Sequence, residues 1–169
     1  MKFKLLQLFL LTIAAQASYA DIPNNYQPMV VEAPFSLSER VFDLTPALEE
    51  SKKVKKPILI YFGAADCPPC KVYTSFLKDK ASELQPHFSK YVVVDIRTWL
   101  KGGKIHFLIH DKKLTSKEFL NHIGDENKDL RYPSWWALDQ HAKVTKQLPR
   151  GIDSYIDVES HKQLLSVVK

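Results

Sequence analysis

The chain has two cysteines, Cys67 and Cys70, with two prolines between them. Thiols at this spacing can form a disulfide, exchange it with another disulfide, or bind a metal ion. In the loop-entropy account, a disulfide that closes so short a loop adds little to stability. The pair therefore indicates redox or metal chemistry and argues against a purely structural cross-link.

The segments on both sides of the cysteines predict how the thiols are presented. Residues 58–62 form an unbroken apolar run of strand-forming residues, which is typical of a strand buried on both faces. Pro68 suits the first position of a helix, and we expect this helix to end at Pro86. Its apolar face consists of Tyr73, Phe76, Leu77, Ala81 and Leu84.

This arrangement places Cys67 at the N-terminus of a helix. Free backbone N–H groups and the helix dipole stabilise a thiolate at that position. We therefore expect Cys67 to be the exposed, attacking thiol and Cys70 to be the more buried, resolving thiol.

Residues 1–20 have the pattern of a secretory signal peptide. A short basic start precedes an apolar run that is too short for a stable membrane span, and small residues suit cleavage after Ala20. The alternative is an uncleaved N-terminal anchor. Cleavage leaves residues 21–169, the size of one domain, in the periplasm.

The charge of the chain is mild. The formal net charge is +5, and loss of Lys2 and Lys4 with the signal lowers it by two. The basic residues are spread along the chain, so the sequence makes no case for nucleic-acid binding.

Further elements follow from local signals. Helices are predicted at 45–53 with a Thr45 hydroxyl cap, at 116–123 with a Thr115–Glu118 capping box and Gly124 as its stop, and after an Asp157 cap. The strand–helix–strand unit predicts a parallel pair of strands. The predicted strands besides 58–62 are 29–31, 91–96, 105–109, 134–138 and 143–148.

Tyr132 and Pro133 stand before an apolar strand, where proline is unusual because it donates no ladder hydrogen bond. Together with the strand, the Cys-Pro-Pro-Cys and the helix, this pair resembles the thioredoxin superfamily, in the style of periplasmic thioredoxin-like proteins such as the C-terminal domain of DsbD. The resemblance implies an α/β thioredoxin fold in residues 21–169, with a central mixed sheet flanked by helices. An insertion of about residues 97–131 would precede a cis-proline strand headed by Pro133.

The resemblance also implies a function. It implies a periplasmic thiol–disulfide oxidoreductase with Cys67 as nucleophile, Cys70 as resolving thiol, and Tyr132 and Pro133 as substrate-binding residues. The Cys67–Cys70 disulfide would be its redox centre, without a metal or other cofactor. The implied partners are exported proteins with disulfides or thiols, and a membrane electron donor such as a DsbD-like reductase. We expect a monomer.

Four residues would modulate the dithiol. Tyr61 occupies the position where thioredoxins carry a buried aspartate, and it either fills the core or donates a hydrogen bond. Asp66 adds a negative charge that disfavours the thiolate. Pro68 and Pro69 fill the centre of the motif, and Pro69 cannot donate an N–H to the Cys67 sulfur. A less stabilised thiolate means a lower reduction potential, so we expect a reductase more than an oxidase.

Two alternatives belong to other functional classes. The dithiol with histidines such as His106 and His110 could handle copper or zinc, because an even spacing along a strand places both rings on one side. The chain could also be a non-catalytic binding module on a thioredoxin scaffold. Its partner contacts would then include Trp99, Trp135 and Trp136, although strand alternation favours core packing for at least one of the last two.

Overall fold

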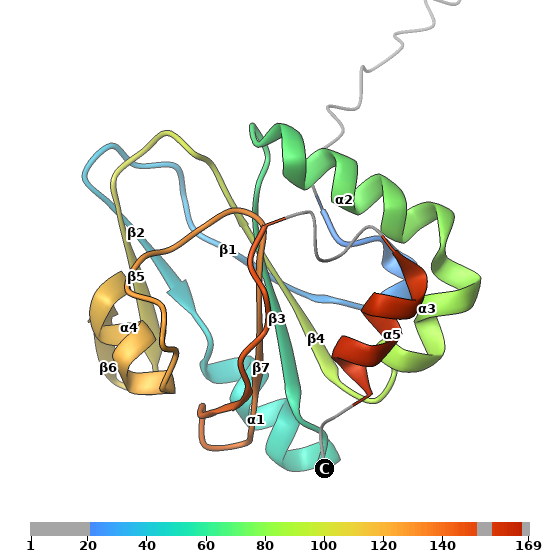
Figure 1. The fold of residues 1–169 in the computed structure, drawn as a ribbon. Helices are drawn as coiled ribbons and strands as arrows, with labels where there is room; N and C mark the ends of the chain where they lie inside the picture. Colours follow the sequence, from blue (N-terminus) through green and yellow to red (C-terminus); the bar gives the residue numbers. More distant parts are fainter. Residues whose placement is uncertain (1–20, 152–156, 167–169) are drawn as a thin grey trace, which may run out of the picture.

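The computed structural model describes residues 21–151 and 157–166 (Figure 1). The predicted signal segment 1–20 lies outside the described residues. Within the described ranges, no helix is long and apolar enough to cross a membrane.

The main sheet has five strands in the order β1-β4-β3-β7-β8. Strands β1, β4 and β3 are parallel, and β7 runs antiparallel to both β3 and β8. The predicted α/β architecture with a mixed central sheet is thereby confirmed. The carboxyl ends of β1, β3 and β4 meet the start of β7 at one edge. The bounds are β1 Met29–Glu32, β3 Ile58–Ala64, β4 Val92–Thr98, β7 Ser134–Leu138 and β8 Val144–Lys146.

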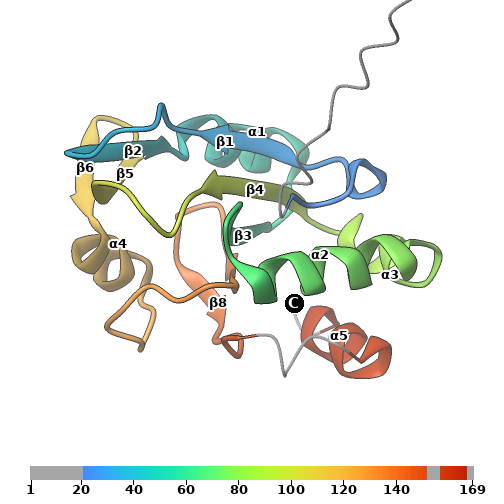
Figure 2. The same cartoon turned by 90° about the horizontal axis from the view of Figure 1, so that it is seen from above.

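Helices cover both faces of this sheet (Figure 2). Because side chains alternate along a strand, Ile58 and Ile60 pack on the side of α1, whereas Leu59 and Tyr61 pack on the side of α2, α3 and α5. These helices are α1 Thr45–Val54, α2 Pro68–Asp79, α3 Ala81–Phe88 and α5 Val158–Leu165, and a short 3₁₀ turn η1 spans Asn24–Tyr26.

The prediction of one long helix that ends at Pro86 is wrong. The chain leaves helical geometry at Lys80, with φ −104° and ψ 18°, and Pro86 lies inside α3. A proline inside a helix removes one hydrogen bond. Tertiary packing outweighs that loss here, because the last residue of α3, Phe88, is fully buried against Tyr26 and Trp135.

The predicted cap of α1 is also wrong. The N-cap position is Leu44, which makes no side-chain cap. The Thr45 hydroxyl accepts a hydrogen bond from the His110 backbone N–H at 2.8 Å, and the Asp43 carboxylate accepts from the Thr45 N–H at 2.9 Å. A distant segment therefore takes the hydroxyl that the local pattern assigned to the cap.

The region between β4 and β7 supplies two strands, β5 and β6, to a second sheet with the order β2-β5-β6, and the third strand, β2, comes from before α1. Strand β5 was predicted, whereas β2 and β6 were not. Strand β2 is parallel to β5, and β6 is antiparallel to it. Helix α4 covers this second sheet through Phe119, whose ring stacks on that of Phe107 with the ring centroids 4.0 Å apart. The bounds are β2 Glu39–Asp43, β5 Lys104–Ile109, β6 Lys112–Thr115 and α4 Ser116–Ile123.

Capping predictions hold for the two later helices. Thr115 and Glu118 form the predicted capping box, and Gly124 ends α4 with φ 81°. Asp157 caps α5 by accepting from the Ser160 N–H. These caps join residues close in sequence, so they depend little on the rest of the fold.

Candidate active site

Cys67 and Cys70 form a disulfide at the start of α2, with Cα atoms 5.2 Å apart. Cys67 is the N-cap residue, and its Sγ accepts a hydrogen bond from the Cys70 backbone N–H at 3.2 Å. Pro68 occupies the first turn, where its missing N–H costs nothing. The predicted position of the sulfur at a helix N-terminus is confirmed.

The expected difference in exposure between the two cysteines is not present. Cys67 is 2% exposed and Cys70 is 0% exposed, so both are buried in the disulfide form. They pack with Ala64 and with the partly buried Tyr132. The segment before β7 therefore packs against the cysteine pair, as the resemblance to the thioredoxin superfamily implies.

The Tyr132–Pro133 peptide bond is cis, as predicted. The Tyr132 ring stacks on Phe62 with centroids 4.6 Å apart, and burial raises the pKa of Tyr132 to about 12. The Pro133 carbonyl accepts a hydrogen bond from the Gly151 N–H at 3.1 Å. Of the two predicted substrate-binding residues, Tyr132 packs against the cysteine pair, and Pro133 follows it in the chain.

Tyr61 fills the core on the face of β3 that α2, α3 and α5 cover. It is fully buried, and its ring lies 5.0 Å from Trp135 and 5.7 Å from Tyr73. The ring lies over Gly63, where an added Cβ would be 2.4 Å from its Cε1 atom. The hydroxyl has no hydrogen-bond partner among the residues that the structure describes. These contacts favour the core-filling role over a hydrogen-bonding one.

A buried carboxyl that was not predicted lies next to Tyr61. Asp95 is the register partner of Tyr61 on β4 and is 1% exposed. Its Oδ2 accepts from the Ile22 N–H and from Arg97 Nε, both at 3.1 Å. Burial raises the pKa of Asp95 to about 6, although the hydrogen bond and charge of Arg97 oppose this. The isolated aspartate within the apolar run 91–96 was the available signal.

We expect the Asp95→Asn substitution to remove the part of the pH dependence of the free energy of unfolding that comes from the Asp95 carboxyl. A folded pKa of about 6 lies above the ordinary value of 3.8. The Asp95 carboxyl therefore contributes its full stabilisation of the folded state at pH values below 3.8, where it is protonated. This stabilisation is lost as the pH rises through about 6. The difference corresponds to about 3 kcal/mol.

Urea unfolding of parent and variant between pH 4 and 7 measures this effect. The stability of Asp95→Asn relative to the parent should rise with pH. The exposed Asp111→Asn serves as the control and should show no such trend. A pH-independent difference between Asp95→Asn and the parent would contradict the prediction.

Asp66, next to Cys67, connects the dithiol to the loop after β4. Its carboxylate accepts a hydrogen bond from the Leu100 N–H at 2.6 Å. The buried Arg40 holds the same loop, because it donates to Thr98 Oγ1 at 2.6 Å and to the Gly103 carbonyl at 3.0 Å. Arg40 was not predicted, since an arginine on an unpredicted strand gives no local signal.

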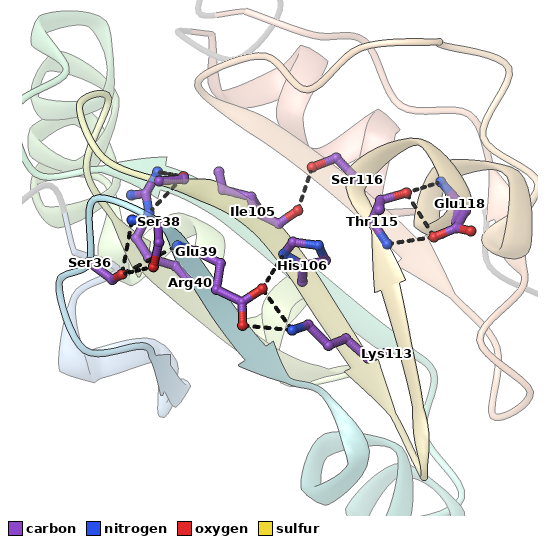
Figure 3. Close-up of polar contacts among 11 residues, drawn as sticks. Ser36, Ser38, Glu39, Arg40, Ile105, His106, Lys113, Thr115, Ser116 and Glu118 are labelled. Atoms are coloured by element: carbon purple, nitrogen blue, oxygen red, sulfur yellow. Dashed lines mark hydrogen bonds and ion pairs between the residues drawn. The ribbon is translucent and has the colours of Figure 1, made fainter.

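The structure separates the two histidines of the metal alternative. His106 lies in β5, and its Nδ1 is 3.7 Å from a Glu39 carboxylate oxygen, which also pairs with Lys113 (Figure 3). His110 follows β5 with φ 52° and lines a separate cavity with His122. Across residues 21–151 and 157–166, no group of three or more His, Cys, Asp or Glu side chains could hold a metal ion.

The three tryptophans divide between core and surface. Trp135 and Trp136 are each 2% exposed, whereas Trp99 is 39% exposed. The Trp136 Nε1–H donates to Asp125 Oδ2 at 2.7 Å. Core packing therefore accounts for the pair on β7, whereas Trp99 is partly exposed at the surface.

Comparisons with protein-family models, curated proteins and solved structures found no match to the chain.

Proposed function

We propose that this chain is an exported thiol–disulfide oxidoreductase with a thioredoxin fold, in which Cys67 is the nucleophile and Cys70 the resolving thiol. The observation that carries the proposal is a Cys67–Cys70 disulfide at the N-terminus of α2, together with a cis Tyr132–Pro133 bond whose tyrosine packs against the two cysteines. The fold assignment is supported by the mixed order β1-β4-β3-β7-β8 with helices on both faces. The sequence of residues 1–20 supports export to the periplasm.

The reaction runs through a mixed disulfide. In the reduced protein, the Cys67 thiolate attacks one sulfur of a partner disulfide, so that the partner S–S bond breaks and its other sulfur leaves as a thiolate, which takes up a proton. Cys70 then loses its proton and attacks the Cys67 sulfur, which releases the second partner thiolate. Two electrons pass to the partner, and a membrane dithiol donor must restore them.

The surroundings of the sulfur favour the reducing direction. The Cys67 sulfur accepts one backbone N–H, from Cys70, and Pro69 has none to donate. Asp66 places a carboxylate next to Cys67 in sequence. Both features stabilise the thiolate less than an unobstructed helix N-terminus would, and a less stabilised reduced form has a lower potential.

The reduction potential of the dithiol tests this function. Equilibration of the chain without residues 1–20 in glutathione and dithiothreitol buffers should give a reduction potential of about −270 mV. Asp66→Asn keeps an acceptor for Leu100 but removes the charge, so its potential should rise. A reduction potential of about −120 mV for the parent would identify a disulfide donor and overturn the reductase assignment.

A further inference from the structure

Four large apolar side chains are exposed on two loops. They are Phe35 (61% exposed), Leu37 (83%), Trp99 (39%) and Leu100 (47%). The first two lie on loop 33–38 between β1 and β2, and the others lie on loop 99–103 between β4 and β5. Other exposed large apolar residues in the described ranges lie singly on separate elements: Val30, Val54 and Val72.

The two loops are joined to each other. The Gly103 N–H donates to the Ser36 carbonyl at 2.7 Å, and the Lys104 N–H donates to the Ser38 carbonyl at 2.9 Å. The Ser36 hydroxyl accepts from the Ser38 and Glu39 N–H groups and shapes the first loop (Figure 3). A Cβ at Gly103 would be 2.3 Å from the Ser38 carbonyl carbon, so this close approach requires glycine.

The loop pair is also joined to the dithiol. Asp66 binds the Leu100 N–H, and the Ala65 N–H donates to the Thr98 carbonyl at 2.9 Å. Figure 1 shows both loops at the end of the molecule where α2 begins. The exposed apolar side chains therefore lie on loops attached to the residues immediately before Cys67.

We propose that Phe35, Leu37, Trp99 and Leu100 form an apolar rim that binds apolar side chains next to the reacting cysteine of a partner polypeptide. Grouped apolar side chains of this kind mark interaction surfaces. This inference rests on the proposed function, because the loops of the rim are hydrogen-bonded to Ala65 and Asp66, immediately before the cysteine that would bond to the partner polypeptide.

Binding of a peptide without a thiol tests the rim directly. The first probe, the leucine peptide, has a central serine in place of the reacting cysteine and a leucine on each side of it. The second probe is the same peptide with both leucines replaced by serine. The parent should bind the leucine peptide about tenfold more tightly in calorimetry. Phe35→Ser with Leu37→Ser should abolish the preference, whereas Val54→Ser, which changes an exposed valine on α1, should retain it.

Exchange kinetics separate the rim from the chemistry. Versions of both peptides that carry a disulfide-bonded cysteine in place of the central serine are compared with glutathione disulfide as substrates. The rim variant, Phe35→Ser with Leu37→Ser, should slow exchange only with the leucine version, by about tenfold. Equal rates and affinities for both peptides in the parent would overturn the rim and leave the proposed function standing. No exchange with any disulfide, together with a retained preference in binding, would overturn the function and support the rim.

Two further outcomes would count against the rim. A parent dimer that the rim variant loses in sedimentation would assign these side chains to a second copy. If the double variant unfolds, Leu37→Ser alone provides the test, because Leu37 is 83% exposed and its loss should not affect folding. An unchanged preference in this variant and in Trp99→Ser would then overturn the proposal.

Discussion

Replacement of Cys70 by serine is expected to stop the reaction at a covalent adduct between Cys67 and the partner, whereas Cys67→Ser is expected to abolish exchange. A serine at position 70 cannot attack the mixed disulfide, so the adduct persists. A serine at position 67 forms no nucleophile of comparable strength at neutral pH, so the rate should fall by about a thousandfold or more. This effect is the largest that we expect from a single substitution.

Intact-mass spectrometry under non-reducing conditions measures the adduct, and dithiothreitol should release it. The double variant with serine at both positions is the matched control and should form none. Because the two cysteines differ so little in exposure, at 2% and 0%, the experiment also tests their roles. A stable adduct in Cys67→Ser, and none in Cys70→Ser, would show that the roles are reversed.

Asp125→Ala is expected to lower the free energy of unfolding by about 3–5 kcal/mol. Asp125 Oδ2 accepts from Arg150 Nη2 at 2.5 Å and from Trp136 Nε1 at 2.7 Å, and the Asp125 and Arg150 side chains are 2% and 7% exposed. The substitution leaves a buried guanidinium without its carboxylate. It should also loosen the site, because Gly151, next to Arg150, bonds to the Pro133 carbonyl.

Urea unfolding at pH 7 measures this loss, with Asp129→Ala as the control. Asp129 is exposed, and Arg150 binds its backbone carbonyl, which the control retains. Burial alone would raise the pKa of Asp125, but hydrogen bonds from Asn127, Trp136 and Arg150 outweigh it and lower that pKa. The carboxylate's contribution is therefore present above the ordinary value of 3.8 and is lost as the pH falls through the lower folded pKa. An equal loss in both variants would contradict the prediction.

Predictions from sequence succeeded where neighbouring residues decide the structure. The apolar run 58–62 lies within β3, and the capping box of Thr115 and Glu118 opens α4. Each depends on burial pattern or on hydrogen bonds across a few residues, which composition and spacing reveal. The helix after Cys67 also begins as predicted, because Pro68 suits its first turn.

Predictions failed where a distant segment decides the structure. Strands β2 and β6 carry charged residues such as Arg40 and Lys113, and they form because β5 offers backbone groups to both. The Thr45 hydroxyl is taken by His110. Hydrogen bonds of this kind compete with local caps, and no periodic pattern in the sequence reports them.

The sequence by itself determined the chemistry that this protein can offer: two thiols at the start of a helix, after a buried strand, with a proline pair between them. Only the tertiary structure decided that Tyr132 packs against the cysteine pair, that Asp95 lies beside Tyr61, and that loops 33–38 and 99–103 meet next to Asp66. The physical reason is that these contacts join residues far apart in the chain. They form only when the strands are ordered into their sheets and their loops are brought to a common edge.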